Sequence, residues 1–524
     1  MSDTAVIESG TRLQNFLDRA GLRGFPWKTA TILYTISWGW LFIVRDSYWA
    51  DDWDTLKFPQ LGTFDFRLLG LAPWTSVIGP LHSISGAGFL RILIFGSFFA
   101  SALAVFGISN QISSLALWQR RVFVLLFLLL PFNHIRVALM TFHYTTGIFL
   151  FYLAWYLITA FKSKKVFCTG LVLFFLSFQM HSLLFLYLLP VTHFAFINQS
   201  NTPWFLRIKI ELISLVTLPL TYVVLRYFFW PERIRYHNLD TSSVSSASLF
   251  IVVAIGGTYL IFVVRSVVGL KMRNSAISLL VLGLFCSLLA LLPYLLAGFY
   301  KTSLSLPFQF LIDFVGRSEY RSRHLALQPL GFSIFLVGLL TLIEVVNIGL
   351  KKLLFGLILV SSLLINLQSG FEYWIDFSKQ NTVVAALHNF DVQNSSVKYQ
   401  VFDRVPLLNA QAAANRFIWK NLVAAAYGED YAKNAEIESV NKCVPFDGSN
   451  FLIVSGPKNH FEAVRNWMKS RDFGFLVKVG VMNGRCLPEM ARVSVKTESW
   501  PVLFFFRGAN FEIVPYPSSR QLFS

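Results

Sequence analysis

Five carboxylates near the start of the chain are spaced closely enough to act together. They follow the first strongly apolar segment and lie at Asp46, Asp51, Asp52, Asp54 and Asp65. Two adjacent carboxylates can supply a general base with a hydrogen-bonding partner, or a pair of metal ligands. We predict that Asp51 or Asp52 accepts the proton of an incoming hydroxyl. The alternative is that these acids face water or cap the helix expected after Asp54.

A basic segment far along the chain offers the complementary chemistry. It lies in the loop 298–324, directly before an apolar helix, and contains Lys301, Arg317, Arg321, Arg323 and His324. Arginine binds phosphate oxygens in a bidentate manner, and the N-terminal end of a helix adds backbone N–H donors. These residues predict a site for a phosphate or pyrophosphate, at headgroup depth if the flanking segments cross a membrane. Binding of ordinary anionic phospholipid, or ion pairs with Asp313 and Glu319, is the alternative.

The composition indicates what kind of scaffold must position these groups. Of the 524 residues, 55% are hydrophobic and only 14% are charged, and the mean hydropathy is +0.56. An ordinary soluble domain carries about 25% charged residues, so this chain cannot cover a water-exposed surface with charge. A soluble enzyme is therefore almost excluded. The net charge of +17 would indicate nucleic-acid binding only if Lys and Arg clustered on one solvated face.

Eleven apolar segments have the composition of membrane-spanning helices. A helix needs roughly 17 to 25 apolar residues to cross a bilayer, or fewer where partner helices shield its ends. The predicted spans are 29–44, 89–109, 122–132, 145–160, 166–180, 183–197, 210–230, 248–268, 275–297, 325–346 and 353–368. Residues 122–132 are short and end in Pro131, and 166–197 would form either a bent hairpin or one long helix. The predicted fold is an all-α polytopic membrane domain over 29–370, after a cytoplasmic segment at 1–28.

The distribution of cations predicts the orientation, because Lys and Arg accumulate on cytoplasmic loops. With a cytoplasmic N-terminus, the inner segments hold more than half of the basic residues that precede Gly370. An odd number of crossings then places the acidic loop, 45–88, and the C-terminal tail outside. Most of the positive charge is thereby explained by topology, so no nucleic-acid partner is expected.

Other polar side chains are expected on the same outer side as the acids. The candidate substrate contacts are Asp54, Arg136, His143, Tyr144 and His181, and Asn133, His134, Arg226, Arg233 and Arg235 share that side. A single histidine is more often a hydrogen-bonded structural residue than a ligand. These positions therefore carry less weight than the acidic pair and the basic loop.

The composition changes at Gly370, and residues 371–524 resemble a soluble domain. Predicted strands are Val397–Phe402, Phe451–Val454, Phe475–Val481, Ala491–Val495 and Val502–Phe506, and predicted helices are Ala410–Ala426 and Phe461–Lys469. The pattern predicts a small mixed α/β extracytoplasmic domain that caps the cleft or helps to bind the acceptor. Cys443 and Cys486 would pair in an oxidising compartment, with two free thiols as the alternative.

These features together resemble the GT-C superfamily of integral-membrane glycosyltransferases. The shared features are an acidic pair after the first span, a basic loop before a late span, about eleven crossings and an extracytoplasmic tail. The segment Tyr48-Trp-Ala-Asp-Asp-Trp53 is similar to the Asp-Asp segment of bacterial enzymes that decorate O-antigen or other surface glycans, including serotype-converting glucosyltransferases. The resemblance covers residues 1 to about 370 in architecture, but in residues only the first loop and Arg321-Ser-Arg-His324.

The resemblance implies a particular reaction. Asp51 or Asp52 would be the catalytic base for an acceptor hydroxyl, which attacks the anomeric carbon of a polyprenyl-phosphate sugar while polyprenyl phosphate leaves. The basic residues of 301–324 would hold that phosphate and offset its developing charge. The implied location is the outer side of a bacterial inner membrane. The implied partners are membrane lipids, a glycan acceptor such as O-antigen or lipopolysaccharide, a donor-synthesising glycosyltransferase and a flippase. No cofactor is required, and a divalent metal stays open because some relatives use one.

Two other functions fit parts of the pattern. An O-antigen polymerase or ligase also uses outer arginines on lipid-linked sugars, but it relies on basic residues of large middle loops rather than on an aspartate pair. A transporter of lipids or glycans generally places ionisable or broken-helix sites near the midplane. The acids predicted within spans, Glu211 and Glu344, lie near the cytoplasmic ends instead. The aspartate pair therefore favours the glycosyltransferase.

Overall fold

A computed structural model describes residues 22–44, 46–49, 52–58, 72–132, 134–197, 209–231, 272–296, 325–390, 398–405, 416–439 and 450–481. Contacts between residues divide the chain into two compact units. The first, which we call the helical unit, comprises Met1–Gly39, Phe66–Arg317 and Arg321–Leu367. The second, the mixed unit, comprises Trp40–Asp65, Ser318–Tyr320 and Gln368–Ser524. The part of the acidic loop up to Asp65 therefore belongs to the same unit as the C-terminal tail, and the rest belongs to the helical unit.

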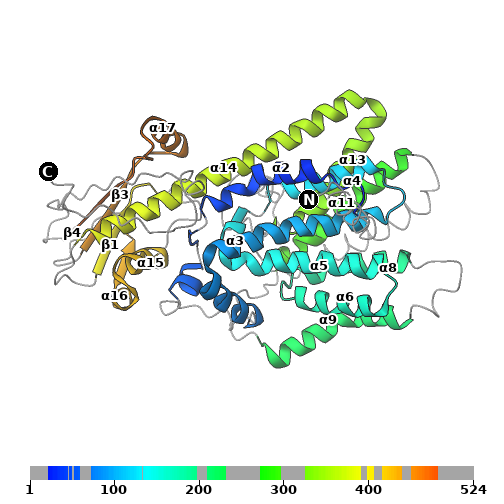
Figure 1. Cartoon of the computed structure of the whole chain (residues 1–524), viewed down its shortest axis with the longest axis horizontal. Coiled ribbons are helices and arrows are strands. Elements are labelled where there is room, and N and C mark those ends of the chain that lie inside the picture. Colours follow the sequence, from blue (N-terminus) through cyan, green and yellow to red (C-terminus); the bar gives the residue numbers. More distant parts are fainter. Residues whose placement is uncertain are drawn as a thin grey trace, which may run out of the picture. The chain divides into compact units, whose positions relative to one another are not determined.

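The described part of the helical unit consists mainly of apolar helices (Figure 1). Its described helices are α2 (Trp27–Trp38), α3 (Ala72–Asn110), α4 (Leu117–Leu129), α5 (Phe142–Ala160), α6 (Lys164–Ser177), α7 (Leu183–Leu186), α8 (Leu188–Ile197), α9 (Lys209–Phe229), α11 (Met272–Leu296), α13 (Gln328–Val346) and the start of α14 (Ile348–His388). Two short 3-10 turns, η4 (His134–Val137) and η5 (Leu139–Thr141), connect α4 to α5. The most extensive helix contacts join α11 to α13 and α5 to both α3 and α6.

Five helices in the described part of the chain are long and apolar enough to cross a membrane. They are Ser76–Asn110, Ile210–Phe229, Ser275–Tyr294, Gln328–Val346 and Ile348–His388. Each overlaps a predicted span, and together they indicate a membrane protein. The predicted number of eleven crossings is not confirmed, because other predicted spans form shorter or less apolar helices. The span predicted at 248–268 lies outside the described residues.

Two helices differ in extent from the prediction. The span predicted at 89–109 is the second part of α3, which is broken at Gly86, where φ is +73°. Glycine adopts this φ readily, so the break follows from a local backbone preference that hydropathy does not register. The span predicted at 353–368 is part of α14, which continues to His388. Hydropathy falls after Leu367, but a fall in hydropathy does not by itself end a helix.

A small residue lets α11 and α13 approach closely. A Cβ atom on Gly283 would collide with the backbone of Phe335. The Gln328 side chain adds a hydrogen bond across the pair, because its Nε2 donates to the carbonyl of Ser287 over 3.0 Å. In lipid, burial of apolar surface does not drive helices together, so close packing and side-chain hydrogen bonds hold such pairs.

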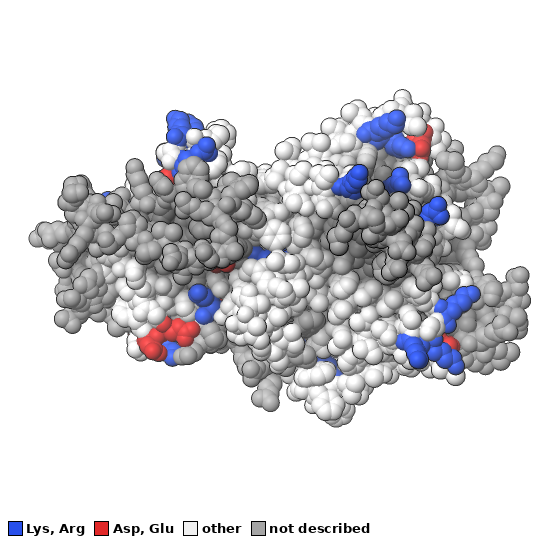
Figure 2. Space-filling view, in the orientation of Figure 1, with Lys and Arg blue, Asp and Glu red and all other residues white. Residues whose placement is uncertain are grey.

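Lys and Arg side chains gather toward one end of the helical unit (Figure 2). Two of them are tied to neighbouring elements: Arg121 Nε donates to the carbonyl of Gly24 over 2.8 Å, and Lys351 pairs with Glu344 at 2.6 Å. Lys351 also lies over the Trp118 ring, 3.9 Å from its centroid. Among the described residues, this gathering of exposed cations is of the kind typical of membrane proteins.

The mixed unit contains a four-stranded sheet with the order β2-β1-β3-β4. Its strands are β1 (Lys398–Asp403), β2 (Glu436–Ser439), β3 (Asn450–Ser455) and β4 (Leu476–Val481), and its described helices include α15 (Arg416–Tyr427), α16 (Glu429–Lys433) and α17 (His460–Ser470). Strand β1 pairs in parallel with β2 and β3, whereas β4 is antiparallel to β3. This arrangement confirms the predicted small α/β domain. The strands predicted at 491–495 and 502–506 lie outside the described residues.

The core of the mixed unit joins three distant parts of the sequence. Val401 and Leu452 of the sheet pack in one buried cluster with Ile375 of α14, Trp419 of α15 and Trp53 of the acidic loop. Replacing Trp53 or Trp419 by alanine should lower the free energy of unfolding by about 3–5 kcal/mol, because the cavity left behind closes only partly. The acidic loop is thus built into the domain core, which restricts where its carboxylates can lie.

Candidate functional site

Two hydrogen bonds join Asp52 to Trp49 within the acidic loop. The Oδ2 atom of Asp52 accepts a hydrogen bond from the backbone N–H of Trp49 over 3.1 Å, and the Asp52 N–H donates to the Trp49 carbonyl over 3.0 Å. The Trp49 indole donates to the Ser47 hydroxyl over 2.7 Å, and that hydroxyl donates to the carbonyl of Val44. Aspartate and serine favour such side-chain-to-backbone bonds in turns. These bonds hold the described part of the loop in one conformation.

Asp52 is fully buried, with 0% of its surface exposed. A buried carboxylate needs hydrogen bonds to replace its lost hydration, and the Trp49 N–H supplies one. A general base must contact the hydroxyl that it deprotonates, and Asp52 presents no exposed surface to one. Its geometry therefore suits a positioning role for the loop.

Aromatic rings pack the loop against α14. The Trp49 ring meets Tyr373 edge-on, with ring centroids 5.0 Å apart, and Trp40 stacks on the same Tyr373 ring at 5.5 Å. Gly370 allows this approach, since a Cβ atom there would lie 2.5 Å from Cγ of Trp40. The loop is thus fixed by packing as well as by hydrogen bonds, and such support is what a site needs to hold a reactive group in place.

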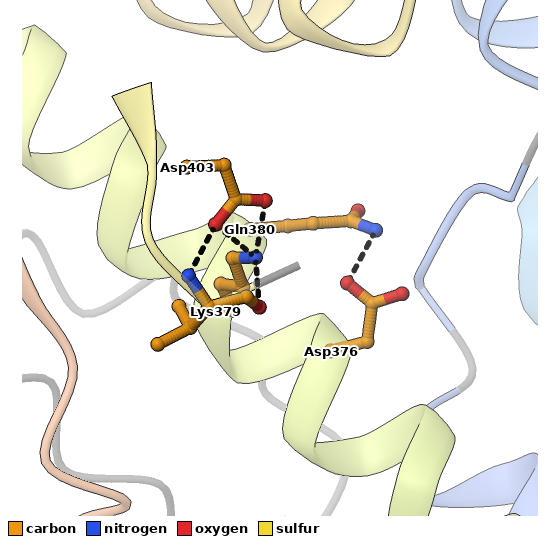
Figure 3. Close-up of polar contacts among 5 residues, drawn as sticks. Asp376, Lys379, Gln380 and Asp403 are labelled. Atoms are coloured by element: carbon orange, nitrogen blue, oxygen red, sulfur yellow. Dashed lines mark hydrogen bonds and ion pairs between the residues drawn. The ribbon is translucent and has the colours of Figure 1, made fainter. Parts of the chain in front are cut away.

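A buried ion pair that the sequence pattern does not indicate connects α14 to the end of β1 (Figure 3). Lys379 Nζ donates to both carboxylate oxygens of Asp403, over 2.9 and 2.8 Å, and to the carbonyl of Val405 over 3.0 Å. The side chains of Lys379 and Asp403 are 3% and 9% exposed. On the same helix, Gln380 donates to Asp376 over 3.3 Å. Because three acceptors match the three ammonium protons, this pair stabilises the fold rather than offering groups to a substrate.

An exposed ion pair in the same sheet provides a contrast. Lys398 and Glu436 lie 2.8 Å apart and join β1 to β2, with side chains 59% and 70% exposed. The hydrogen bond and the charge of Glu436 raise the pKa of Lys398 above its ordinary value. Water screens such a pair, so it contributes little to stability.

Burial raises the pKa of the Tyr399 phenol, next to Lys398 in β1. The Tyr399 hydroxyl shares a hydrogen bond of 2.9 Å with the Tyr431 hydroxyl.

Arg136, a predicted substrate contact, is buried within the helical unit. Its guanidinium lies 3.6 Å from the centroid of the Trp38 ring and 4.1 Å from that of Phe98, and it donates to the carbonyl of Phe132 over 3.0 Å. Arginine can be buried in this way because its guanidinium is planar and weakly hydrated and stacks on aromatic faces. These contacts give Arg136 a structural role between α2 and α3.

The irregular segment between α4 and α5 is held by further buried polar groups. His134 Nε2 hydrogen-bonds with Oδ1 of Asn366 over 3.1 Å, and Asn366 Nδ2 donates to the carbonyl of Leu129 over 2.8 Å. Arg91 of α3 donates to the carbonyl of Val137. Irregular backbone in apolar surroundings persists only where the protein itself satisfies its polar groups. Side chains from α3 and α14 do so for this segment.

His143 and His181 form a second polar cluster in the helical unit. The Nδ1 atom of His143 hydrogen-bonds with the carbonyl of Met140, so in the neutral ring Nε2 is a bare acceptor. Among the described residues, neither this Nε2 nor that of His181 has a hydrogen-bond partner, and both atoms are shielded from solvent. His181 interacts electrostatically with His143 and with Arg226 of α9. The Tyr144 ring packs on His143 at 4.0 Å. Three predicted contacts, His143, Tyr144 and His181, thus lie in one part of the helical unit, and His181 also feels the charge of Arg226.

The remaining predicted site residues lie outside the described part of the chain. They are Asp51, Lys301, Arg317, Arg321, Arg323, His324, Cys443, Cys486 and the side chain of Asp54. The backbone of Asp54 belongs to η2 (Trp53–Lys57), a five-residue π-helix. Among the described residues, no group of three or more His, Cys, Asp or Glu side chains could hold a metal ion.

The fold and the buried polar groups define a broad class: a mostly helical protein with membrane-type apolar helices and a small mixed α/β unit that contains an acidic loop. In comparisons with known proteins, no family model, no curated protein and no solved structure matches the chain.

Proposed function

We propose that the chain is an integral-membrane glycosyltransferase. It would transfer a sugar from a polyprenyl-phosphate donor to a cell-surface glycan, such as O-antigen or lipopolysaccharide, on the outer side of a bacterial cytoplasmic membrane. The observation that carries this proposal is the aspartate pair that follows the first apolar helix. Its second member, Asp52, is buried and hydrogen-bonded to Trp49, which restrains the backbone next to Asp51.

In this proposal the two aspartates have different roles. Asp51 accepts the proton of the acceptor hydroxyl while that oxygen attacks the anomeric carbon of the donor. A new glycosidic bond forms, the bond between the anomeric carbon and the phosphate oxygen breaks, and its electron pair leaves with polyprenyl phosphate. Asp52 is a positioning residue, because its bond to Trp49 holds the loop that carries the base.

Other groups would bind the donor. The proposed phosphate ligands are Lys301, Arg317, Arg321, Arg323 and His324, whose positive charges would offset the charge that develops on the leaving phosphate. In the helical unit, the bare Nε2 of His143 can accept a hydrogen bond from a sugar hydroxyl. Arg226 adds positive charge beside His181. The two histidines are therefore proposed as contacts to the polar head of the donor.

One observation favours a second candidate, a transporter of lipid-linked glycans. His143 is buried and Nε2 of His181 is shielded from solvent, and ionisable groups among apolar helices often mark a transport pathway. Transport and transfer differ in their products, because only transfer creates a glycosidic bond.

The decisive experiment uses the purified chain in proteoliposomes with a polyprenyl-phosphate hexose and isolated surface glycan. We expect mass spectrometry to detect glycan that is heavier by one hexose. Movement of the lipid-linked sugar between leaflets without any such product would instead support the transporter. In cells, deletion of the gene should remove one sugar from the surface glycan, and an unchanged glycan profile would contradict the proposal.

A further inference from the structure

Helix α17 presents an outward face that mixes large apolar and cationic side chains. Phe461 is 80% exposed and Met468 is 63% exposed. Arg465 and Lys469 are also exposed, and the four residues follow a helical repeat that places them on one side of α17. Figure 2 shows the Lys and Arg side chains gathered on this helix. An exposed phenylalanine and methionine next to cations is unusual for a surface that meets only water.

The opposite face of α17 fixes the helix to its own unit. Ala463 is fully buried, and the Trp467 ring meets Trp374 of α14 edge-on with centroids 5.1 Å apart. Asn459 caps the helix by accepting the N–H of Glu462 over 2.9 Å. The outward face is therefore held in a set orientation.

The contact between Trp467 and Trp374 places α17 beside the segment of α14 around Trp374. Trp374 follows Leu367, the last residue of the apolar stretch of α14, by about 10 Å of helix. Phe371, 41% exposed, lies between them, with its ring 5.9 Å from that of Trp374. Tryptophan is enriched where a membrane helix passes from hydrocarbon to headgroups. Helix α17 thus packs on the part of α14 that belongs to the mixed unit, beside an aromatic pair of the kind found at membrane interfaces.

We propose that the outward face of α17 docks on the bilayer surface and binds anionic phospholipid headgroups. Phe461 and Met468 enter the boundary between headgroups and acyl chains, while Arg465 and Lys469 meet lipid phosphates. Helices that lie in a membrane interface have this composition, with apolar anchors beside cations. The residues from Lys458 to Asp472 carry four cations and two carboxylates, so the surface is complementary to an anionic one. The proposal does not depend on the glycosyltransferase reaction.

Photo-crosslinking of the full chain in lipid nanodiscs tests this docking directly. A photoreactive phenylalanine analogue replaces Phe461 in one protein and Asp430 in another. Asp430 lies on α16 of the same unit, and its side chain is 97% exposed, so it is a matched control. We expect lipid adducts at position 461 and none at 430, with a higher yield when a quarter of the phosphatidylcholine is replaced by phosphatidylglycerol.

A charge-reversed variant tests the headgroup contacts. Arg465→Glu with Lys469→Glu should lower the phosphatidylglycerol-dependent yield at 461 by about fivefold or more, because each cation contributes to attraction by an anionic surface. Both residues are exposed, so the melting temperature should not change. Equal lipid adducts at 461 and 430 would overturn the proposal. So would adducts at 461 to another protein, rather than to lipid, in native membranes.

Discussion

Individual buried polar groups of the mixed unit and of the helical unit differ in whether their hydrogen bonds are made, and each unit contains both kinds. In the mixed unit, Asp52 is bonded to Trp49, and Lys379 has three acceptors. In the helical unit, Nε2 of His143 and Nε2 of His181 are shielded from solvent and have no partner among the described residues. A buried polar group with all of its bonds made stabilises a fold, whereas one with an unused atom costs free energy. A group of the first kind stabilises structure, and for His143 and His181 we propose that a ligand supplies the missing contact. The indole Nε1 atoms of Trp53 and Trp419 in the core of the mixed unit are also without a partner among the described residues, so an unused atom alone does not identify a site.

The largest expected effect separates the two aspartates. Asp51→Asn should lower the rate of sugar transfer by about 10³-fold, since general-base catalysis contributes roughly 10² to 10⁴. Asp52→Asn should keep most of the rate, because the amide oxygen can still accept the Trp49 N–H. Single-turnover assays with a radiolabelled donor measure both rates.

The Asp52→Ala variant is the control for position. It removes the acceptor for Trp49, and we expect a loss of unfolding free energy of about 1–3 kcal/mol together with a lower rate. Should Asp52→Asn abolish transfer while Asp51→Asn remains active, the assignment of the two roles would be wrong.

The second effect concerns the buried ion pair of the mixed unit. Lys379→Ala leaves the Asp403 carboxylate buried without its cation, which should cost about 3–5 kcal/mol of unfolding free energy. Chemical denaturation followed by tryptophan fluorescence measures the change. Lys398→Ala is the matched control, because it breaks an exposed pair of the same length, and its cost should stay below about 1 kcal/mol. Equal costs for the two variants would contradict the structural role of Lys379.

The double variant Lys379→Met with Asp403→Leu sharpens this test. It removes both charges and retains apolar volume, and such replacements are often neutral or stabilising. We expect it to recover most of the stability that Lys379→Ala loses. A double variant as unstable as the single one would show that packing, not charge, holds α14 to β1.

Local sequence patterns predict the elements of this fold better than they predict its long-range pairs. Runs of apolar residues indicate the helices, alternation within 397–402 indicates β1, and the short apolar segments 451–454 and 475–481 indicate β3 and β4. Strand β2 was not predicted, because its four residues, Glu436–Ser439, contain two glutamates and lie at the edge of the sheet. The continuation of α14 past Leu367 was missed because hydropathy reports the surroundings of a helix and not its end.

The candidate site shows the same limit. The sequence identifies the aspartate pair by its position, but it does not show that Asp52 is buried or that Trp53 enters the core of the mixed unit. Both facts depend on residues more than 300 positions away in the chain, such as Tyr373 and Ile375. The predicted topology puts His143 and His181 on one side of the membrane. The electrostatic interaction of His181 with Arg226 depends on how the helices pack, which the sequence pattern does not reveal.

A smaller effect is expected at Arg136, whose guanidinium is buried between two aromatic rings of the helical unit. Arg136→Lys replaces a planar guanidinium between two rings with a compact, strongly hydrated ammonium, and should cost about 2 kcal/mol. Arg121→Lys is the control, because Arg121 is exposed. Among the described residues, its one hydrogen bond is from Nε to the carbonyl of Gly24. Thermal unfolding in detergent compares the melting temperatures of the two variants. An equal decrease in both would contradict a special contribution of the Arg136 guanidinium between the two rings.

The smallest effect on stability, and the sharpest test of the comparison, lies at His181. Because its Nε2 is shielded and unpartnered among the described residues, His181→Phe should leave the unfolding free energy within about 0.5 kcal/mol of the native value or raise it. His193 is the matched histidine: its Nδ1 accepts the Trp155 indole N–H over 2.9 Å, so His193→Phe should cost about 1–3 kcal/mol. If His181 contacts the donor, His181→Phe should raise the KM for the polyprenyl-phosphate sugar about tenfold while His193→Phe does not. A His181 variant that is less stable than the His193 variant, with an unchanged KM, would place His181 with the structural groups and leave the helical unit without a recognition cluster.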